Sequence, residues 1–298
     1  MYEVYRIIGV VRYYLKYAGS GIDETTSTVL LTASIIALVA IAYFLGGLNF
    51  SILLSKKLYG VDVRTYGSGN AGTTNMLRTF GNKAGALALI GDISKTLVSC
   101  LLGYIVMGRL GAFVGGLSCM IGHMFPALYK FKGGKGVACA VAVVFITDVG
   151  NPNYYYIPVV FLIMFAMFAL LLFGTKYMSI AAVMSILIYP LVMNAFDIPI
   201  KNAILAENPP SLLGSIYIVD SGLYLLIALL MAVLVIFMHR ANIKRLLNKE
   251  ENKFSFHKKG EKTVFEAEQE AEEHKKQREE MRAAGLTKKN KNTSSKKK

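Results

Sequence analysis

Long runs of apolar residues alternate with short polar stretches along most of the chain. A helix needs about 20 mostly apolar residues to cross the hydrocarbon core of a bilayer. Four runs meet this length clearly, and they cover residues 28–54, 154–173, 178–196 and 221–238. Three weaker runs are short, rich in glycine or interrupted by polar residues, and they cover residues 84–107, 111–129 and 136–150. The pattern predicts an all-α polytopic membrane protein with about seven transmembrane helices.

Lysine and arginine are concentrated in every second connection between these runs. The first connection contains Lys56, Lys57, Arg64, Arg78 and Lys83, whereas the second contains only Arg109. The third contains Lys130, Lys132 and Lys135, and the chain after the last run is again basic. Since cytoplasmic loops are enriched in Lys and Arg, the N-terminus is predicted outside and the C-terminus in the cytoplasm of a cell-membrane protein.

Composition supports this class and divides the chain into three parts. Hydrophobic residues make up 54% of the chain, and the mean hydropathy is +0.46, which is typical of membrane proteins. The parts are an N-terminal surface or interfacial segment (1–27), a membrane domain (28–253) and a charged, largely disordered cytoplasmic tail (254–298). Within this tail, residues 266–285 carry helix-forming residues and Glu→Lys/Arg pairs at helical spacing, so they are compatible with an exposed helix.

The net charge of +14 indicates the kind of partner, and the spacing of the three cysteines bears on disulfides and metal sites. Residues 240–298 hold 18 Lys/Arg and 10 Asp/Glu, a net charge of +8 that favours anionic lipid headgroups over nucleic acid as a partner. Cys100, Cys119 and Cys139 lie in or beside apolar runs with no paired spacing. We therefore expect neither a disulfide framework nor a metal site, and no cofactor.

Three polar stretches that contain glycine or basic residues fall on the predicted cytoplasmic side. They are YGSGNAGTTNMLRTFG (66–81), GHMFPALYKFKGGKG (122–136) and HRANIKRLLNKEENK (239–253), called here the first, second and third motifs. Glycine lets the backbone approach a ligand closely, and amides at a helix start attract anions. Lys135 would add a point charge, with Gly133, Gly134 and Gly136 offering backbone donors. The spacing of a Walker phosphate loop is absent.

In this order, the three motifs resemble the signature motifs of the bacterial membrane acyl-phosphate:glycerol-3-phosphate acyltransferases, the PlsY family. The resemblance covers roughly residues 30–253, with departures at Ala71, Thr73, Cys139 and Lys249. It implies seven membrane helices, a site facing the cytosol, and transfer of an acyl group from acyl phosphate to glycerol 3-phosphate. The products would be lysophosphatidic acid and phosphate, the first acylation of phospholipid synthesis. It also implies an acyl-phosphate-forming enzyme as a partner.

The resemblance assigns roles to individual residues. The catalytic set is Ser68, Arg78, Lys135, His239 and Asn242. The set expected to bind substrate phosphate is Gly67, Gly69, Asn70, Thr74, Asn75, Lys132, Gly133, Gly134 and Gly136. His123, Asp92, Lys95 and Glu251 are expected to give structural support, with Asp92 and Lys95 forming an i, i+3 pair on one helix. Arg240 and Lys244 are further cations that the third motif offers to a polyanionic substrate.

Neither histidine near the motifs has the carboxylate five residues on that many other acyltransferases use. Leu128 follows His123 at this distance, and Lys244 follows His239. We therefore expect the substrate's own phosphate to take the hydroxyl proton while His239 hydrogen-bonds the hydroxyl; His239 as general base is the alternative.

A transporter of a phosphorylated or anionic solute is the competing function. Such a protein would concentrate its polar residues near the membrane midplane and show internal repeats. No repeat is evident in the sequence, and the three motifs fall on one predicted face. A membrane scaffold would account for the basic tail and not for the motifs.

Overall fold

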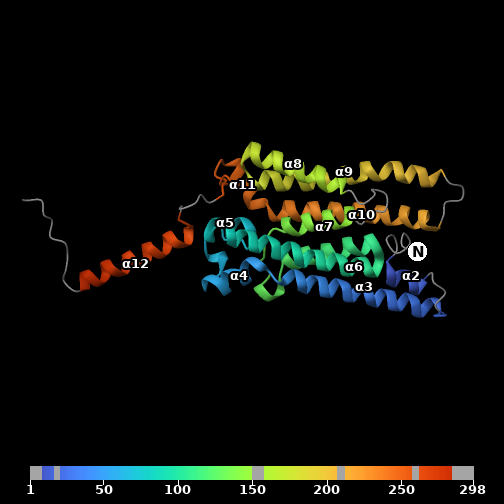
Figure 1. Ribbon diagram of the computed structural model, residues 1–298, viewed down its shortest axis with the longest axis horizontal. Helices are drawn as coiled ribbons and strands as arrows, with labels where there is room; N and C mark the ends of the chain where they lie inside the picture. The colour runs from blue at the N-terminus through green and yellow to red at the C-terminus, as the bar shows by residue number, and fades with distance from the viewer. Residues whose placement is uncertain (1–8, 17–20, 150–157, 207–211, 257–261, 284–298) are drawn as a thin grey trace, which may run out of the picture.

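The computed structural model describes residues 9–16, 21–149, 158–206, 212–256 and 262–283, and these form an elongated helical bundle (Figure 1). No strand occurs among the described residues. The predicted N-terminal segment 1–27 lies partly outside them, and the end of the tail, residues 284–298, lies wholly outside them.

The longer helices of the described membrane domain run along the long axis of the bundle (Figure 1). They are α3 (Glu24–Gly47), α6 (Asn82–Met124), α7 (Val137–Val149), α8 (Val159–Thr175), α9 (Met178–Leu205) and α10 (Leu212–Met238). The short helices α4 (Phe50–Tyr59), α5 (Thr73–Phe80) and α11 (Arg240–Leu247) gather at one end, and α2 (Val10–Lys16) lies at the other. Helix α12 (Val264–Ala283) projects away from the end that carries α4, α5 and α11.

Helix α6 is a hairpin of two limbs and not one continuous rod. Its backbone leaves helical geometry at Met107 and at Gly108, where φ is 60°. The limbs then pass backbone to backbone, because a Cβ added to Gly103 would lie 1.9 Å from the Gly111 carbonyl oxygen. Small residues allow such close approach between membrane helices. The turn at residues 107–108 separates the two weak apolar runs of the sequence, 84–107 and 111–129.

Among the described residues, four helical stretches are long and apolar enough to cross a membrane, and several of their boundaries differ from the prediction. The stretches are Glu24–Tyr59, Asn82–Tyr129, Met178–Leu205 and Val219–Met238, with shorter apolar helices at Val137–Val149 and Val159–Thr175. The predicted run 28–54 lies within the stretch Glu24–Tyr59, which is divided because α3 stops at Gly47 and α4 begins at Phe50. Helix α9 continues past residue 196 to Leu205 and contains Pro190 and Pro199, which membrane helices tolerate when neighbours satisfy the freed backbone groups.

Charged side chains inside α6 make hydrogen bonds to the segment where α3 ends and α4 begins. Lys95 Nζ lies 2.8 Å from Asp92 Oδ1, so the predicted pair forms. The same ammonium donates to the carbonyls of Gly46 (2.8 Å) and Leu48 (2.9 Å) at the end of α3. His123 Nδ1 on the second limb lies 3.0 Å from Lys95 Nζ. These contacts satisfy carbonyls that the end of α3 leaves without helical partners.

Candidate active site

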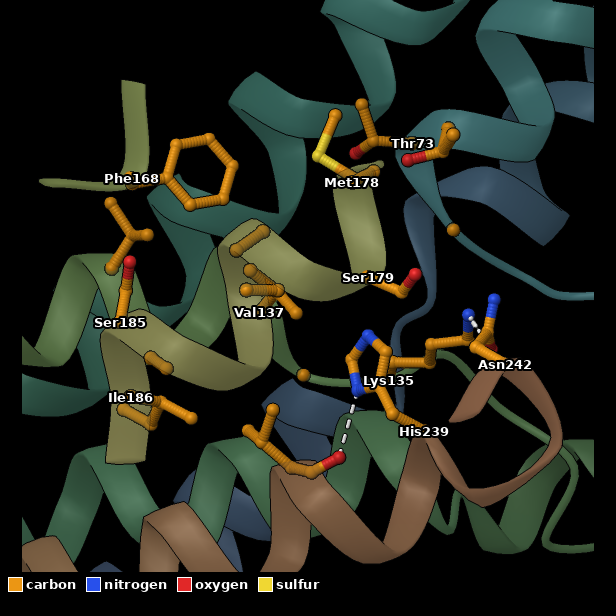
Figure 2. A pocket seen from close by; sticks show the side chains of 18 of the residues that line it. Thr73, Lys135, Val137, Phe168, Met178, Ser179, Ser185, Ile186, His239 and Asn242 are labelled. Carbon is orange, nitrogen blue, oxygen red and sulfur yellow. Dashed lines mark hydrogen bonds between the residues drawn. The ribbon is translucent and has the colours of Figure 1, made fainter. Parts of the chain in front are cut away.

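The three motifs surround one cavity of about 630 Å³ at the end of the bundle that carries α5 and α11 (Figure 2). The expected catalytic residues Ser68, Arg78, Lys135, His239 and Asn242 all line it. Of the residues expected to bind phosphate, Gly67, Asn70, Thr74, Asn75 and Gly136 line the cavity, whereas Gly69, Lys132, Gly133 and Gly134 do not. Asp92, His123 and Glu251 also reach its wall, and Lys95 lies behind it.

Asn75 shapes the loop of the first motif. Its Oδ1 accepts from the Ser68 amide at 2.9 Å, and its Nδ2 donates to the carbonyls of Val63 and Tyr66, both at 3.0 Å. Asn75 thus lines the cavity with its buried amide engaged by the backbone, and it shapes the loop around the proposed phosphate site. The Gly69 amide is engaged as well, since it donates to the Tyr66 carbonyl at 3.0 Å.

Arg78 projects from α5 into the same cavity. The described residues provide no hydrogen bond or ion pair for its guanidinium. A guanidinium presents its donors as a planar fork that matches phosphate. Arg78 is therefore available to an anionic ligand.

The glycines of the second motif pack the chain against α6 and do not present donors. The Gly133 amide donates to the Met124 carbonyl at 3.2 Å, and the Gly134 amide to the His123 carbonyl at 3.1 Å. A Cβ at Gly134 would lie 2.2 Å from His123 Nε2. Both amides are therefore bonded within the fold in this structure, and neither points a free donor into the cavity. Lys132 is exposed, and its carbonyl accepts from Arg64 at 3.0 Å.

Lys135 connects the second motif to the third. Its Nζ donates to Asn242 Oδ1 at 2.5 Å. Burial lowers the pKa of Lys135 to about 8; Glu251 opposes this shift, and the positive charges of Arg245 and Arg78 add to it. Three cationic side chains, Arg78, Lys135 and Arg245, therefore lie close together at the cavity.

Helix α11 turns one face toward the cavity. His239, Asn242 and Arg245 are spaced by three residues and all line it, as expected for neighbours on one helix face. Arg240 and Lys244 are exposed outside the cavity, so the expectation that they serve the site is wrong. Arg245 was not predicted, although its spacing from His239 could have indicated it.

Glu251 holds side chains of the third motif in place through hydrogen bonds. Its carboxylate accepts from Asn242 Nδ2 (2.6 Å), Arg245 Nε (2.8 Å) and Ser179 Oγ (3.2 Å). Burial raises the pKa of Glu251, but the hydrogen bonds from Asn242 and Arg245 outweigh it and hold the pKa below its ordinary value. Ser179, at the start of α9, is a second lining residue that the sequence did not reveal.

His239 lies at the junction of α10 and α11, and one of its ring nitrogens is hydrogen-bonded to the backbone. Its Nδ1 lies 2.8 Å from the Val235 carbonyl oxygen (Figure 2). Because a carbonyl only accepts, Nδ1 carries the proton and Nε2 of the neutral ring is an acceptor. Burial, followed by the positive charge of Lys135, lowers the pKa of His239 to about 4. The ring is therefore neutral near pH 7.

The rest of the cavity is an apolar arm between α7, α8 and α9. Its wall is made mainly by one face of each helix, with Val137, Val141 and Val144 from α7, Phe161, Met164, Phe165 and Phe168 from α8, and Met178, Ala182, Ile186 and Tyr189 from α9. Ser179 and Tyr189 are ten residues apart on α9, so the arm extends about 15 Å along that helix. A cationic mouth joined to an apolar arm fits an anionic headgroup with a hydrocarbon chain.

No group of His, Cys, Asp or Glu that could hold a metal ion occurs in the described part of the chain. Cys100, Cys119 and Cys139 are free thiols buried in the bundle.

Comparisons with known proteins agree with this geometry. Residues 36–249 match the family model described as glycerol-3-phosphate acyltransferase. A glycerol-3-phosphate acyltransferase of Finegoldia magna is 36% identical over 222 residues, which is 74% of this chain and 96% of the relative. One from Clostridioides difficile is 35% identical over 226 residues, covering 74% and 95%.

Solved structures give the same result. The glycerol 3-phosphate form of PlsY (YgiH), an integral membrane glycerol 3-phosphate acyltransferase, aligns with a TM-score of 0.59 at 31% identity. Its lysophosphatidic acid form aligns with a TM-score of 0.58 at 32% identity. Each alignment covers 74% of this chain and 96% of the solved one.

Proposed function

The chain belongs to the glycerol-3-phosphate acyltransferase family, and we propose that its cavity transfers an acyl group from acyl phosphate to glycerol 3-phosphate. Its membership confirms the resemblance of the three motifs. It is an integral membrane acyltransferase that makes 1-acylglycerol 3-phosphate, or lysophosphatidic acid. The observation that carries the proposal is the junction of a cationic mouth with an apolar arm in one cavity.

The charges at the mouth suit two phosphate-bearing substrates. Arg78, Lys135 and Arg245 line it with Glu251 as the opposing carboxylate. Glu251 is engaged by Arg245, with 2.8 Å between Nε and Oε2, which leaves Arg78 and Lys135 to meet incoming anions. Charges inside a partly desolvated cavity interact with a ligand more strongly than they would in water.

The two substrates occupy different parts of the cavity in this proposal. The acyl phosphate places its chain in the arm and its phosphate near Lys135 and Gly136, where the arm meets the mouth. Glycerol 3-phosphate has no chain, so it takes the side formed by the first motif, with its phosphate on Arg78. This arrangement brings its free hydroxyl toward the acyl carbon, and such positioning alone supplies much of a transfer rate.

The transfer needs little acid–base assistance, because acyl phosphate is an activated mixed anhydride. The glycerol hydroxyl oxygen attacks the acyl carbon, the bond from that carbon to the phosphate oxygen breaks, and phosphate leaves with the electron pair. The hydroxyl proton passes to substrate phosphate, whose second pKa is about 6. His239 Nε2 accepts a hydrogen bond from the other hydroxyl of glycerol 3-phosphate and so orients the substrate, and its pKa of about 4 makes it a weaker base than substrate phosphate.

The proposal includes the arrangement in the membrane. Counting the two limbs of α6 separately, α3, α6, α7, α8, α9 and α10 provide seven crossings. The lysine- and arginine-rich connections lie at the end of the bundle that carries the cavity, which supports a site facing the cytoplasm of the cell membrane and an external N-terminus. An enzyme that forms acyl phosphate would be its partner, since the donor must be supplied.

Product formation by purified protein tests the proposal. Protein in detergent, given palmitoyl phosphate and radiolabelled glycerol 3-phosphate, is expected to form labelled lysophosphatidic acid and release one phosphate per turnover. Palmitoyl-CoA should not replace the donor. Lys135→Ala is the matched inactive control, and Lys132→Ala, an exposed lysine outside the cavity, is the active one. Equal rates with palmitoyl-CoA would contradict the choice of donor.

A further inference from the structure

The start of the tail helix α12 lies against the membrane domain, where Phe265 packs on aromatic side chains. Phe265 lies in a cluster with Tyr59 at the end of α4, Tyr66 in the first motif and Phe80 at the end of α5. Ring centroids of Phe265 are 5.8, 5.6 and 5.2 Å from those of Tyr59, Tyr66 and Phe80. Tyr59 and Phe80 are stacked at 4.1 Å. We call these four residues the aromatic anchor.

The start of α12 is built to hold Phe265 in this orientation. The Thr263 amide donates to Glu266 Oε2 at 2.8 Å, and the Glu266 amide donates to Thr263 Oγ1 at 3.2 Å. This reciprocal arrangement is a capping box, which fixes where a helix begins. From Glu266 to Met281 every residue is exposed. The attachment is therefore local to the first residues of α12.

The aromatic anchor lies directly behind the wall of the cavity. Phe80 ends α5, an eight-residue helix that also carries Asn75 and Arg78. The Tyr66 carbonyl accepts from Asn75 Nδ2 and from the Gly69 amide, each at 3.0 Å. Phe265 also packs against the buried cluster that includes Met76 of α5 and Ala71 of the first motif. A helix of two turns has little stability of its own in water, so α5 depends on such packing.

We infer that Phe265 is a positioning residue, through which the C-terminal tail holds α5 and the first-motif loop in place for glycerol 3-phosphate. The inference goes beyond the matched residues 36–249, which end before the tail. It rests on the proposed function for the identity of the substrate. Phe265 acts through Phe80 and Tyr66 on Arg78 and the loop of residues 66–72, and it does not line the cavity itself.

Steady-state kinetics of tail variants test the inference. Phe265→Ala, and truncation after Phe256, are expected to raise KM for glycerol 3-phosphate about fivefold. The kcat and the KM for palmitoyl phosphate should change less than twofold, because Lys135 and the apolar arm do not contact the aromatic anchor. Phe265→Leu should restore most of the affinity. Truncation after Ala283, which keeps α12, and Glu272→Ala, on its exposed part, should behave as the full chain.

A second variant and a second readout separate this inference from the proposed function. Tyr59→Leu changes the same cluster from α4, so it should raise the same KM and add little to Phe265→Ala. Hydrogen exchange of residues 66–80 should be faster in Phe265→Ala than in the full chain, whether or not the protein turns over palmitoyl phosphate. Unchanged exchange and unchanged KM in the folded Phe265→Ala protein would overturn the inference. An inactive full chain with faster exchange in the variant would overturn only the proposed function.

Discussion

The Lys135 ammonium donates to the Asn242 side-chain oxygen at 2.5 Å, across 107 positions of sequence. This bond joins the second motif to the third and brings a cation and a hydrogen-bonding amide to the same point of the cavity. Asn242 is in turn held by Glu251. The position of the charge that meets substrate therefore depends on a carboxylate that has no chemical role of its own.

Loss of Glu251 should weaken the site through Asn242 and Arg245. Hydrogen bonds to charged groups contribute about 1.5–3 kcal/mol, so Glu251→Ala should lower kcat/KM about 10- to 100-fold. In the double variant with Asn242→Ala, the losses should be far from additive, since both remove the same constraint. Glu250→Ala changes an exposed neighbour and should leave kcat/KM unaltered. Additive losses would show that the two residues act independently.

The lowered pKa of Lys135 predicts a loss of substrate affinity in alkali. The ammonium is charged below its pKa of about 8 and becomes neutral as pH rises through that value. The apparent KM for palmitoyl phosphate should therefore rise between pH 7 and pH 9.5. Lys135→Arg, whose charge persists to pH 12 and above, should be weaker overall and lack this rise. A flat wild-type profile to pH 9.5 would contradict the assignment.

The acidic limb of the rate profile should belong to the substrate and not to His239. The pKa of His239 is about 4, whereas a phosphate monoester titrates near pH 6. His239→Gln keeps a hydrogen-bonding side chain, so we expect a loss of about 10- to 100-fold in kcat with the limb near pH 6 retained. Disappearance of that limb, together with rescue by added imidazole, would instead identify His239 as the general base.

Gly134→Ala should destabilise the protein and not selectively weaken substrate binding. The new methyl group would lie 2.2 Å from His123 Nε2 and 2.6 Å from the Ala71 carbonyl oxygen. Overpacking of this kind costs about 1–3 kcal/mol, which should appear as a lower thermal midpoint in detergent. Gly174→Ala is the control, because a Cβ there meets nothing within 4 Å. An unchanged thermal midpoint together with a raised KM for substrate would instead support a role of Gly134 in phosphate binding.

The apolar arm predicts a change in acyl-chain preference when it is shortened. Ser185 lines the arm six residues beyond Ser179 on α9 (Figure 2), a distance of about 9 Å along the helix. Ser185→Phe should lower kcat/KM for palmitoyl phosphate at least tenfold more than for octanoyl phosphate. Met184→Phe, at a neighbouring position outside the cavity, should affect both donors equally. If Ser185→Phe lowered kcat/KM equally for both donors, the acyl chain would not lie beside Ser185 in the apolar arm.

The sequence predicted the helical class, the common location of the three motifs and several of the residues that line the cavity. These features follow from local signals, namely apolar runs, alternating Lys and Arg content, and motif order. The roles of Asn75, Gly133 and Gly134 could not be predicted, because each depends on a backbone partner that only the fold brings near. Sequence alone could not show whether a glycine amide is available to a ligand or already bonded.

Other errors had local causes that the sequence does contain. Arg245, and not Lys244, faces the cavity because it keeps the three-residue spacing from His239 and Asn242. Helix α9 extends to Leu205, beyond the predicted end at residue 196, and contains both Pro190 and Pro199, which a membrane helix tolerates. Helix α12, Val264–Ala283, covers most of residues 266–285, where the sequence was compatible with an exposed helix. Its attachment through Phe265 was not foreseen, since a single aromatic residue gives no periodic signal.

The hairpin of α6 has a consequence for how the protein is made. Its first limb carries Asp92 and Lys95, and their partner His123 lies near the end of the second limb. A limb entering the bilayer alone would carry two charged groups without the contacts from His123 and from the end of α3, which is unfavourable. We therefore expect the two limbs to leave the translocon together, after α3 is already in place, so that synthesis of residue 123 precedes release of residue 92 into lipid.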